Sequence, residues 1–458
     1  MIYILLSLIV LGISFFLFKK ATGTMALTEL NLISFNFYYQ LILQIFIGTN
    51  IVILGLDNHY MLNKITDFSL KQEVYFSVLF VLIVMPLTMW LISMVFKFKA
   101  KEEWNAYQGK EIQSLITKED KSAFITLILF TMVSFVSVVY TFISIGTVPI
   151  LSMLSEAPPE EVNRLRIIAS HEFAGNVYVR NILGLAMTPI LSYVAYTYTV
   201  KSNFKGWKIL FLILFVLSVA ILTYNTAKAP VLMYILSFIF LRVLIKGKIK
   251  VKTLVIFGAA VSFLLVIFYI FFGGGNTTFL SINSGPIGRI LLSQLSSLYF
   301  HFHYFPEIIP FLDGRGMPGF VMRMFDMESV RTSRMIMELV NPEGVRNGTA
   351  GVMNTIFTAE AYANFGWLGI IGGTIYIGVY IQLIYIFFMR VAKNPLTIAL
   401  LTYLTYNLPL TGGFFDFIYN PGLIIVIILL ISFYISSMII QRALNKIEKL
   451  RERRVINE

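Results

Sequence analysis

The chain has 458 residues, of which 57% are hydrophobic and only 13% are charged. This composition excludes a soluble globular protein, because apolar runs of roughly 16 to 25 residues, long enough to cross a bilayer, recur along the sequence. A net charge of +12 would suggest a nucleic-acid partner in a soluble protein, but here loop charges that set membrane topology explain it, and we expect no nucleic acid.

Eleven apolar segments are predicted to be membrane-spanning helices, so the expected fold is an all-α polytopic membrane protein. These segments are 2–18, 31–56, 74–96, 122–145, 181–200, 209–225, 230–245, 253–272, 366–389, 396–412 and 421–441. We expect a bundle at 1–272 that includes an outer segment at 146–180. A large extracytoplasmic loop at 273–365, three spans at 366–441 and a basic tail at 442–458 follow.

The basic residues predict the topology, because 24 of the 36 fall in one set of alternate loops and in the tail. By the positive-inside rule these loops are cytoplasmic, which places the amino terminus outside and the carboxyl terminus inside. The other face carries 12 basic residues, and nine of them are arginine: 164, 166, 180, 289, 315, 323, 331, 334 and 346. The planar arginine fork suits phosphate or carboxylate, so this face is interpreted as anion-binding; the alternative is that these arginines pair with nearby acids.

The outer segment is predicted to form a helix that starts at the Pro158-Pro159-Glu160-Glu161 run, where a proline and early acids favour a helix start. Glu160, Arg164 and His171 then share one helix face. Either Arg164 pairs with Glu160, or Arg164 and Arg166 bind a phosphate group.

In the large loop, Gly288-Arg289 opens an amphipathic stretch that reaches the aromatic run 299–305 and ends at Pro306. Its rings suit either stacking on sugars or a membrane aromatic belt. His301 and His303 within it are candidate general bases. The next stretch, 320–340, is predicted to be one helix with local pairs Arg323–Asp326, Glu328–Arg331 and Arg334–Glu338. Arg289 and Arg346 lack such partners and are better candidates for anion binding.

Several kinds of site are excluded or disfavoured. The chain has no cysteine, no regular metal-ligand spacing, no phosphate-binding P-loop and no dinucleotide fingerprint, so we expect no metal and no cofactor. The predicted spans contain almost no ionisable residues and no obvious repeat, which argues against a coupled transporter.

Three features resemble the Wzy-type oligosaccharide repeat unit polymerases of bacterial O-antigen and capsule synthesis. The large loop closes in Glu360-Ala361-Tyr362-Ala363-Asn364-Phe365-Gly366, which is similar to the Glu-x-Tyr-x-Asn-Phe-Gly segment of that family. The turn 223–230 resembles its small polar turn, with Lys228 where arginine is usual. An outer loop contains Arg164 and, at the eleventh position after it, Gly175; the second copy of this spacing is missing.

The resemblance implies a membrane glycosyltransferase of GT-C-like fold in the bacterial cytoplasmic membrane. Its substrates would be undecaprenyl-pyrophosphate-linked oligosaccharides, and its partners membrane lipid, a chain-length regulator and a flippase. We assign Arg164, Arg166, Lys228 and Arg289 to the pyrophosphate, and Arg346 to substrate binding. The general base would be His301, His303 or Glu360, while Tyr362 and Asn364 would order the site.

Three other functions stay open. An O-antigen ligase-like enzyme shares the expected fold but passes the finished chain to a different acceptor. A flippase or exporter would move the same lipid-linked sugars. An assembly subunit of a polysaccharide machine would use the arginine-rich loop as a partner surface.

Overall fold

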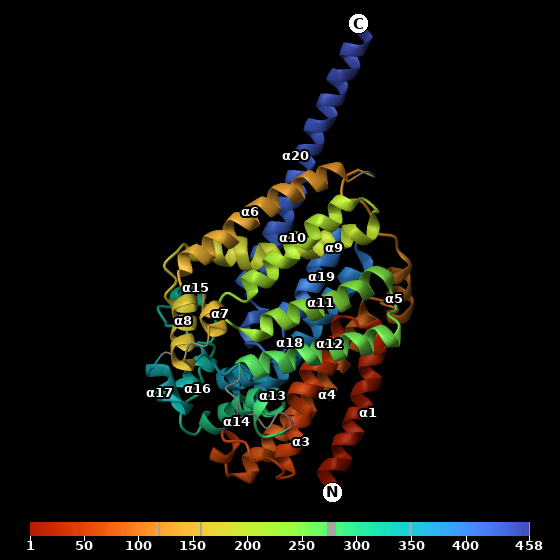
Figure 1. Ribbon diagram of the computed structural model, residues 1–458. Coiled ribbons are helices and arrows are strands. Elements are labelled where there is room, and N and C mark those ends of the chain that lie inside the picture. The colour runs from red at the N-terminus through yellow and green to blue at the C-terminus, as the bar shows by residue number, and fades with distance from the viewer. Residues whose placement is uncertain (118–119, 156–157, 273–280, 348–349, 458) are drawn as a thin grey trace. The chain divides into compact units, whose positions relative to one another are not determined.

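A computed structural model describes residues 1–117, 120–155, 158–272, 281–347 and 350–457 (Figure 1). Helices make up 76% of it, and no strand occurs in these ranges. The glycine run at 273–275, the predicted start of the large loop, lies outside the described residues. The all-α fold predicted from the sequence is therefore confirmed for the described part of the chain.

Eight helical segments are long and apolar enough to cross a membrane, as expected for a multi-pass membrane protein. Among the described residues they are Ile2–Glu29, Leu32–Ile53, Phe68–Val95, Lys121–Ile145, Lys205–Leu222, Lys228–Lys246, Thr358–Arg390 and Phe414–Arg453. The other three predicted spans are also helical, but they are not among the eight segments that are long and apolar enough to cross a membrane. Segment 181–200 is a π-helix followed by a 15-residue α-helix, 253–272 lies in one α-helix, and 396–412 holds a 13-residue helix that ends at Asn407.

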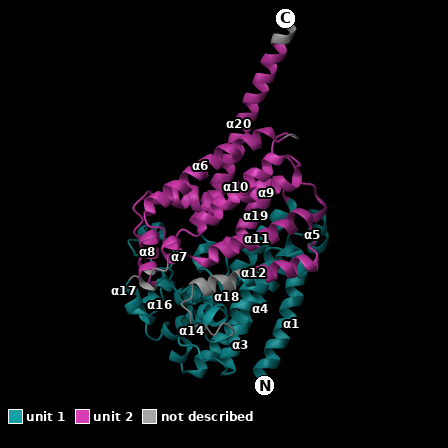
Figure 2. Cartoon of the chain, in the orientation of Figure 1, with its two compact units in different colours: residues 1–107, 262–390, 408–420 teal, residues 108–261, 391–407, 421–458 magenta. Residues whose placement is uncertain are grey.

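The chain divides into two units that interleave along the sequence (Figure 2). Unit 1 comprises Met1–Tyr107, Ser262–Arg390 and Leu408–Asn420, and unit 2 comprises Gln108–Val261, Val391–Asn407 and Pro421–Glu458. Each unit is therefore built from three separate stretches of sequence.

Unit 1 is organised around two long helices, Phe68–Val95 and Thr358–Arg390, which pack closely against each other. Its elements are α1 (Ile2–Thr22), η1 (Leu27–Glu29), α2 (Leu32–Phe35), η2 (Asn36–Phe46), α3 (Ile47–Ile53), η3 (Leu62–Lys64), α4 (Phe68–Val95), α5 (Ala100–Gly109, divided between the units at Tyr107), α13 (Gly285–Gly288), η5 (Arg289–Ser293), α14 (Gln294–Tyr304), α15 (Gly319–Arg323), α16 (Thr332–Val340), α17 (Pro342–Arg346), α18 (Thr358–Arg390) and η6 (Phe414–Phe417). A Cβ on Gly378 of α18 would lie 3.0 Å from the Met85 carbonyl oxygen of α4. The buried Gln382 amide then joins three helices, because it donates to the Ala21 carbonyl of α1 (3.1 Å) and to Ser93 Oγ of α4 (2.9 Å).

Unit 2 contains the remaining helices. They are α6 (Lys121–Ile145), α7 (Pro149–Leu154), α8 (Pro159–His171), η4 (Val179–Ala186), α9 (Met187–Lys201), α10 (Lys205–Leu222), α11 (Lys228–Lys246), α12 (Val251–Phe272, divided between the units at Val261), α19 (Pro395–Asn407) and α20 (Pro421–Asn457). Hydroxyl groups join its apolar helices: Ser437 Oγ of α20 bonds Thr126 Oγ1 of α6 at 2.9 Å, and Ser237 Oγ of α11 donates to the Tyr193 hydroxyl of α9 at 2.8 Å. Buried hydroxyls paired in this way are the usual polar contacts between helices in a membrane.

Candidate functional site

The segment Glu360–Gly366 forms a sharp break inside α18. Gly366 has φ 58° and ψ −146°, a left-handed backbone conformation that glycine adopts without steric strain. The piece before the break turns back against the piece that follows it. A Cβ on Gly369 would lie only 2.1 Å from the Ala361 carbonyl oxygen, and one on Gly373 would lie 3.4 Å from Ala361 Cβ. Glycines three to four residues apart thus allow the two helical pieces to touch.

The break frees backbone carbonyl groups, and a neighbouring loop satisfies them. The Leu312 and Asp313 amides donate to the carbonyls of Ala363 (2.9 Å) and Asn364 (3.0 Å). The Asn364 side chain is fully buried; it accepts from the Gly316 amide at 2.9 Å and donates to the Glu360 carbonyl at 2.8 Å. Asn364 therefore fixes both the folded-back helix and the loop around it.

The Glu360 carboxylate lies at the start of η6 within the same unit. Its Oε2 accepts from the Phe415 amide at 3.1 Å. A Cβ on Gly413 would lie 2.7 Å from this oxygen and 3.3 Å from Asp416 Oδ2, so two carboxylates flank one glycine. Asp416 Oδ2 in turn accepts from the Gly413 amide at 3.0 Å. A partly buried carboxylate held by a backbone N–H is oriented to accept a proton from a bound hydroxyl group.

Tyr362 supports this arrangement from a buried position. Its ring stacks on Phe302 with centroids 3.9 Å apart and planes 7° apart, and Phe311 meets it edge-on at 5.7 Å. Tyr362 is 5% exposed, so the stack holds the folded-back helix and leaves little ring surface open to a sugar. Trp367, just after the break, donates through Nε1 to Glu73 Oε1 at 2.7 Å.

The two candidate histidines on α14 lie in different surroundings. His301 is 1% exposed, and its Nδ1 donates to the Ser297 carbonyl oxygen at 2.7 Å. Burial lowers the pKa of His301 to about 4, an effect that exceeds the opposing effect of this hydrogen bond. His303 is partly exposed and lies edge-on to Tyr304 with ring centroids 5.2 Å apart. Of the two, His303 is the one that a substrate can reach.

The buried imidazole predicts a pH dependence of stability. The pKa of His301 is lowered from 6.5 to about 4, so the unfolded chain binds a proton in this range that the folded protein does not. The free energy of unfolding is therefore largest above pH 6.5, and it falls by up to about 3 kcal/mol as the pH drops towards 4. Thermal unfolding in detergent should show that the unfolding temperature drops less between pH 7.5 and pH 4.5 for His301→Gln than for the wild type. His303→Gln is the matched control, and equal profiles for all three proteins would contradict the assignment.

Arg289 and Arg346 are both exposed in unit 1, at the first residue of η5 and the last of α17. Within the described residues neither forms an ion pair. Both side chains are accessible to an anion, and nothing in the described structure brings either one to Glu360.

The single helix predicted for 320–340 is wrong. The structure has two shorter helices, α15 and α16, separated by a turn in which Asp326 has φ 53°. Of the three predicted pairs only Arg334–Glu338 forms, at 2.9 Å within α16. The other two needed a continuous helix to bring their residues together, and neither occurs in the described part of the chain.

In unit 2, α8 begins at Pro159 as predicted and presents both of its arginines to solvent. Arg164 and Arg166 lie on either side of the buried Leu165, and two residues along a helix they point in nearly opposite directions. The two guanidinium groups therefore do not approach one phosphate from the same side of the helix. The Glu160 side chain is not among those described, so the predicted Glu160–Arg164 pair stays a prediction.

Arg180 is a buried cation that the sequence did not single out, because it stands at the edge of a predicted span. It is 5% exposed at the start of η4, and its guanidinium lies over the rings of Phe173 (4.5 Å) and Tyr224 (5.3 Å). Nη1 donates to the Ala169 carbonyl at the end of α8 (2.7 Å), and Nε donates to Asn181 Oδ1 (3.0 Å). No carboxylate pairs with it among the described residues.

Arg180 also connects α8 to the turn that carries Lys228. The turn residue Asn225 donates from Nδ2 to Ser170 Oγ on α8 at 3.1 Å, beside the carbonyl that Arg180 binds. Lys228 is the first residue of α11 and is partly buried. The structure thus places the Lys228 turn and the carboxyl end of α8 next to each other within unit 2.

Removing the Arg180 side chain should loosen this attachment. We expect Arg180→Leu to lower the free energy of unfolding by about 2 kcal/mol, because the Ala169 carbonyl loses its donor in a buried position. Arg164→Leu, a change of the same kind at an exposed position, should leave it within about 0.5 kcal/mol. Thermal unfolding in detergent measures both, and an equal loss in the two variants would exclude a specific role for Arg180 in fastening α8.

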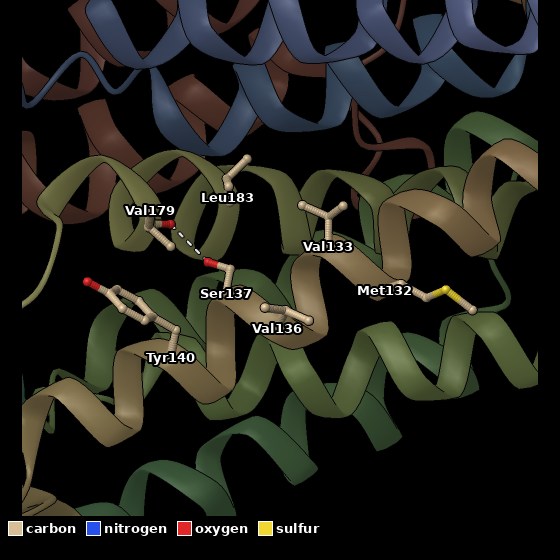
Figure 3. Close-up of a pocket in the computed structure, with 7 residues that line it drawn as sticks. All are labelled: Met132, Val133, Val136, Ser137, Tyr140, Val179 and Leu183. Atoms are coloured by element: carbon tan, nitrogen blue, oxygen red, sulfur yellow. Dashed lines mark hydrogen bonds between the residues drawn. The ribbon is translucent and has the colours of Figure 1, made fainter.

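A groove of about 460 Å³ runs along α6 beside η4 (Figure 3). It is lined by Met132, Val133, Val136, Ser137, Tyr140, Val179 and Leu183. Both hydroxyl groups of its lining already form hydrogen bonds: Ser137 Oγ donates to the Val179 carbonyl at 2.9 Å, and the Tyr140 hydroxyl accepts from the Asn176 amide at 2.8 Å. The groove wall is apolar and suits a hydrocarbon chain better than a polar ligand.

Comparison with known proteins gives no further guide to the site. No family model, no curated protein and no solved structure matches the chain.

Proposed function

We propose that the chain is a polymerase that joins undecaprenyl-pyrophosphate-linked oligosaccharide repeat units into O-antigen or capsular polysaccharide. The observation that carries this proposal is the Glu360 carboxylate, held against the Phe415 amide inside a folded-back helix. It belongs to the segment that resembles the Wzy-type polymerases. The multi-pass membrane character supports a substrate that is itself anchored in the bilayer.

In the proposed reaction Glu360 removes the proton from a hydroxyl group of the acceptor saccharide. The acceptor oxygen bonds to the anomeric carbon of the donor saccharide, and the bond from that carbon to the pyrophosphate oxygen breaks. The leaving group is undecaprenyl pyrophosphate. Asn364 and Tyr362 act as positioning residues, because they hold the backbone that carries Glu360.

Cations stabilise the charge that develops on the leaving pyrophosphate. We assign this role to Arg289 and Arg346 of unit 1, the unit that carries Glu360, because both are exposed and neither forms an ion pair within the described residues. Arg164, Arg166 and Lys228 belong to unit 2, and we assign them to the first capture of the anionic substrate.

We also propose a membrane topology for the whole chain. All eleven apolar segments cross the membrane in a GT-C-like arrangement, with the amino terminus outside and the carboxyl terminus in the cytoplasm of a bacterial cell. Glycosyl transfer is metal-free and takes place on the outer face of the cytoplasmic membrane. A flippase supplies the substrate there, and a chain-length regulator contacts the enzyme.

The test uses purified protein with a lipid-pyrophosphate-linked repeat unit, and the products are separated by size. A ladder of multiples of the repeat unit is the expected result. Transfer only to an added core lipid would replace the polymerase with a ligase. Movement of the substrate across vesicles without any new glycosidic bond would replace it with a flippase, and binding of a partner without either activity would leave an assembly role.

A further inference from the structure

The segment 316–329 forms a closed loop on unit 1. Two hydrogen bonds join its ends: the Val330 amide donates to the Arg315 carbonyl at 2.8 Å, and Ser329 Oγ donates to the Met317 carbonyl at 2.6 Å. The Gly316 amide fixes the base of the loop to the Asn364 side chain at 2.9 Å. The loop is therefore held at its base by three hydrogen bonds.

The outer part of this loop exposes large apolar side chains. Phe320, Met324, Phe325 and Met327 are 48, 77, 61 and 46% exposed, and they fall within eight consecutive residues. Scattered apolar side chains are ordinary on a protein surface, but a contiguous group of this kind marks an interaction surface. We call these four residues the apolar tip.

The apolar tip is continuous with a membrane-spanning segment. The Phe320 ring packs on Tyr419 with centroids 5.0 Å apart. Tyr419 and Ile418, which are 37 and 53% exposed, belong to the apolar segment Phe414–Arg453. The apolar tip is therefore continuous with exposed residues at the start of a segment that is long and apolar enough to cross a membrane.

The charges of the loop fit a location at the membrane surface. Arg323, Asp326 and Glu328 are exposed beside the apolar side chains. Charged side chains next to exposed apolar ones suit the boundary between water and the acyl chains, where the apolar groups can enter the lipid while the charges stay hydrated. Phenylalanine, methionine and a neighbouring tyrosine are suited to this depth.

From this geometry we infer that loop 316–329 inserts its apolar tip into the lipid leaflet on its own side of the membrane. The occupant of this surface is lipid, and neither a second copy of the chain nor another protein covers it. The inference depends on the loop and its continuity with the apolar segment, and it holds whichever reaction the protein catalyses.

The chain contains no cysteine, so a single cysteine can carry a probe without any prior substitution. We would introduce Met324→Cys, label it with an environment-sensitive fluorophore and reconstitute the full chain into vesicles. Glu343→Cys, at an exposed polar position on α17 in the same unit, is the matched control. Phe325→Cys provides a second tip position should the first variant fold poorly, and a monodisperse elution profile is required of each.

Nitroxide-bearing lipids with the quencher near the glycerol, and aqueous iodide, then report on the two positions. We expect lipid quenching at residue 324 to exceed that at residue 343 by at least about three-fold, with the reverse order for iodide. Strong iodide quenching and weak lipid quenching at residue 324 would place the tip in water and overturn the inference. Protection from both quenchers would also overturn it, because a protein surface would then cover the tip.

Discussion

Replacing Glu360 with glutamine is expected to reduce chain extension by a factor of roughly 100 to 10,000, the usual range for loss of a general base. The substitution is conservative for the fold, since the glutamine oxygen still accepts from the Phe415 amide that Oε2 binds at 3.1 Å. The protein should therefore purify normally and retain its unfolding temperature. The measurement is the rate at which the ladder of repeat-unit multiples grows.

Glu343→Gln is the control for this experiment, because Glu343 is an exposed acid on the same unit and has no contact with Glu360 in the structure. Its ladder should match that of the wild type. Asp416→Asn tests the second carboxylate beside Gly413 and should reduce the rate less than Glu360→Gln does. Full activity of a folded Glu360→Gln protein would remove Glu360 as the base and return His303 to that role.

The second large effect is expected at Gly369. A methyl group there would lie 2.1 Å from the Ala361 carbonyl oxygen, a backbone atom that cannot move without opening the folded-back helix. We expect Gly369→Ala to lower the free energy of unfolding by at least about 3 kcal/mol, at the upper end for overpacking. Activity should fall with it, because Glu360 would lose its position against Phe415.

The same helix offers a matched control in Gly372, where an added Cβ would meet nothing within 4 Å. Gly372→Ala should be neutral or stabilise the helix by up to about 1 kcal/mol. Thermal unfolding in detergent compares the two variants directly. If both changes proved equally mild, the close approach of Ala361 to Gly369 would not exist in the folded protein.

The features predicted correctly from the sequence are those that depend on local pattern. Long apolar runs predicted the membrane-spanning character, and the double proline at 158–159 predicted the start of α8. Both depend on residues that are neighbours in sequence. The helix predicted for 320–340 failed because the turn at Asp326 belongs to a loop whose ends are joined by contacts with Arg315 and Met317.

The candidate site shows the same limit. The Glu360–Gly366 segment was recognised, but its fold-back depends on donors from Leu312 and Asp313, about fifty residues earlier in the chain. Arg180 was counted among the outer arginines without a role. Its guanidinium lies over the rings of Phe173 and Tyr224, which come from two separate connections between helices. The spacing of residues along the sequence does not predict such contacts, because most of them join parts of the chain that are far apart in sequence.

The interleaving of the two units has a consequence for biosynthesis. The chain passes from one unit to the other five times, and unit 1 is complete only once Asn420 has been made. Gln40, buried in η2, receives its hydrogen bond from the Leu410 amide, 370 residues later. At roughly 5–20 residues per second of synthesis, this polar amide waits some 20 to 70 seconds in the membrane for its partner. During that time the Gln40 amide depends on other hydrogen-bond partners. Neither unit can be made as a single contiguous fragment.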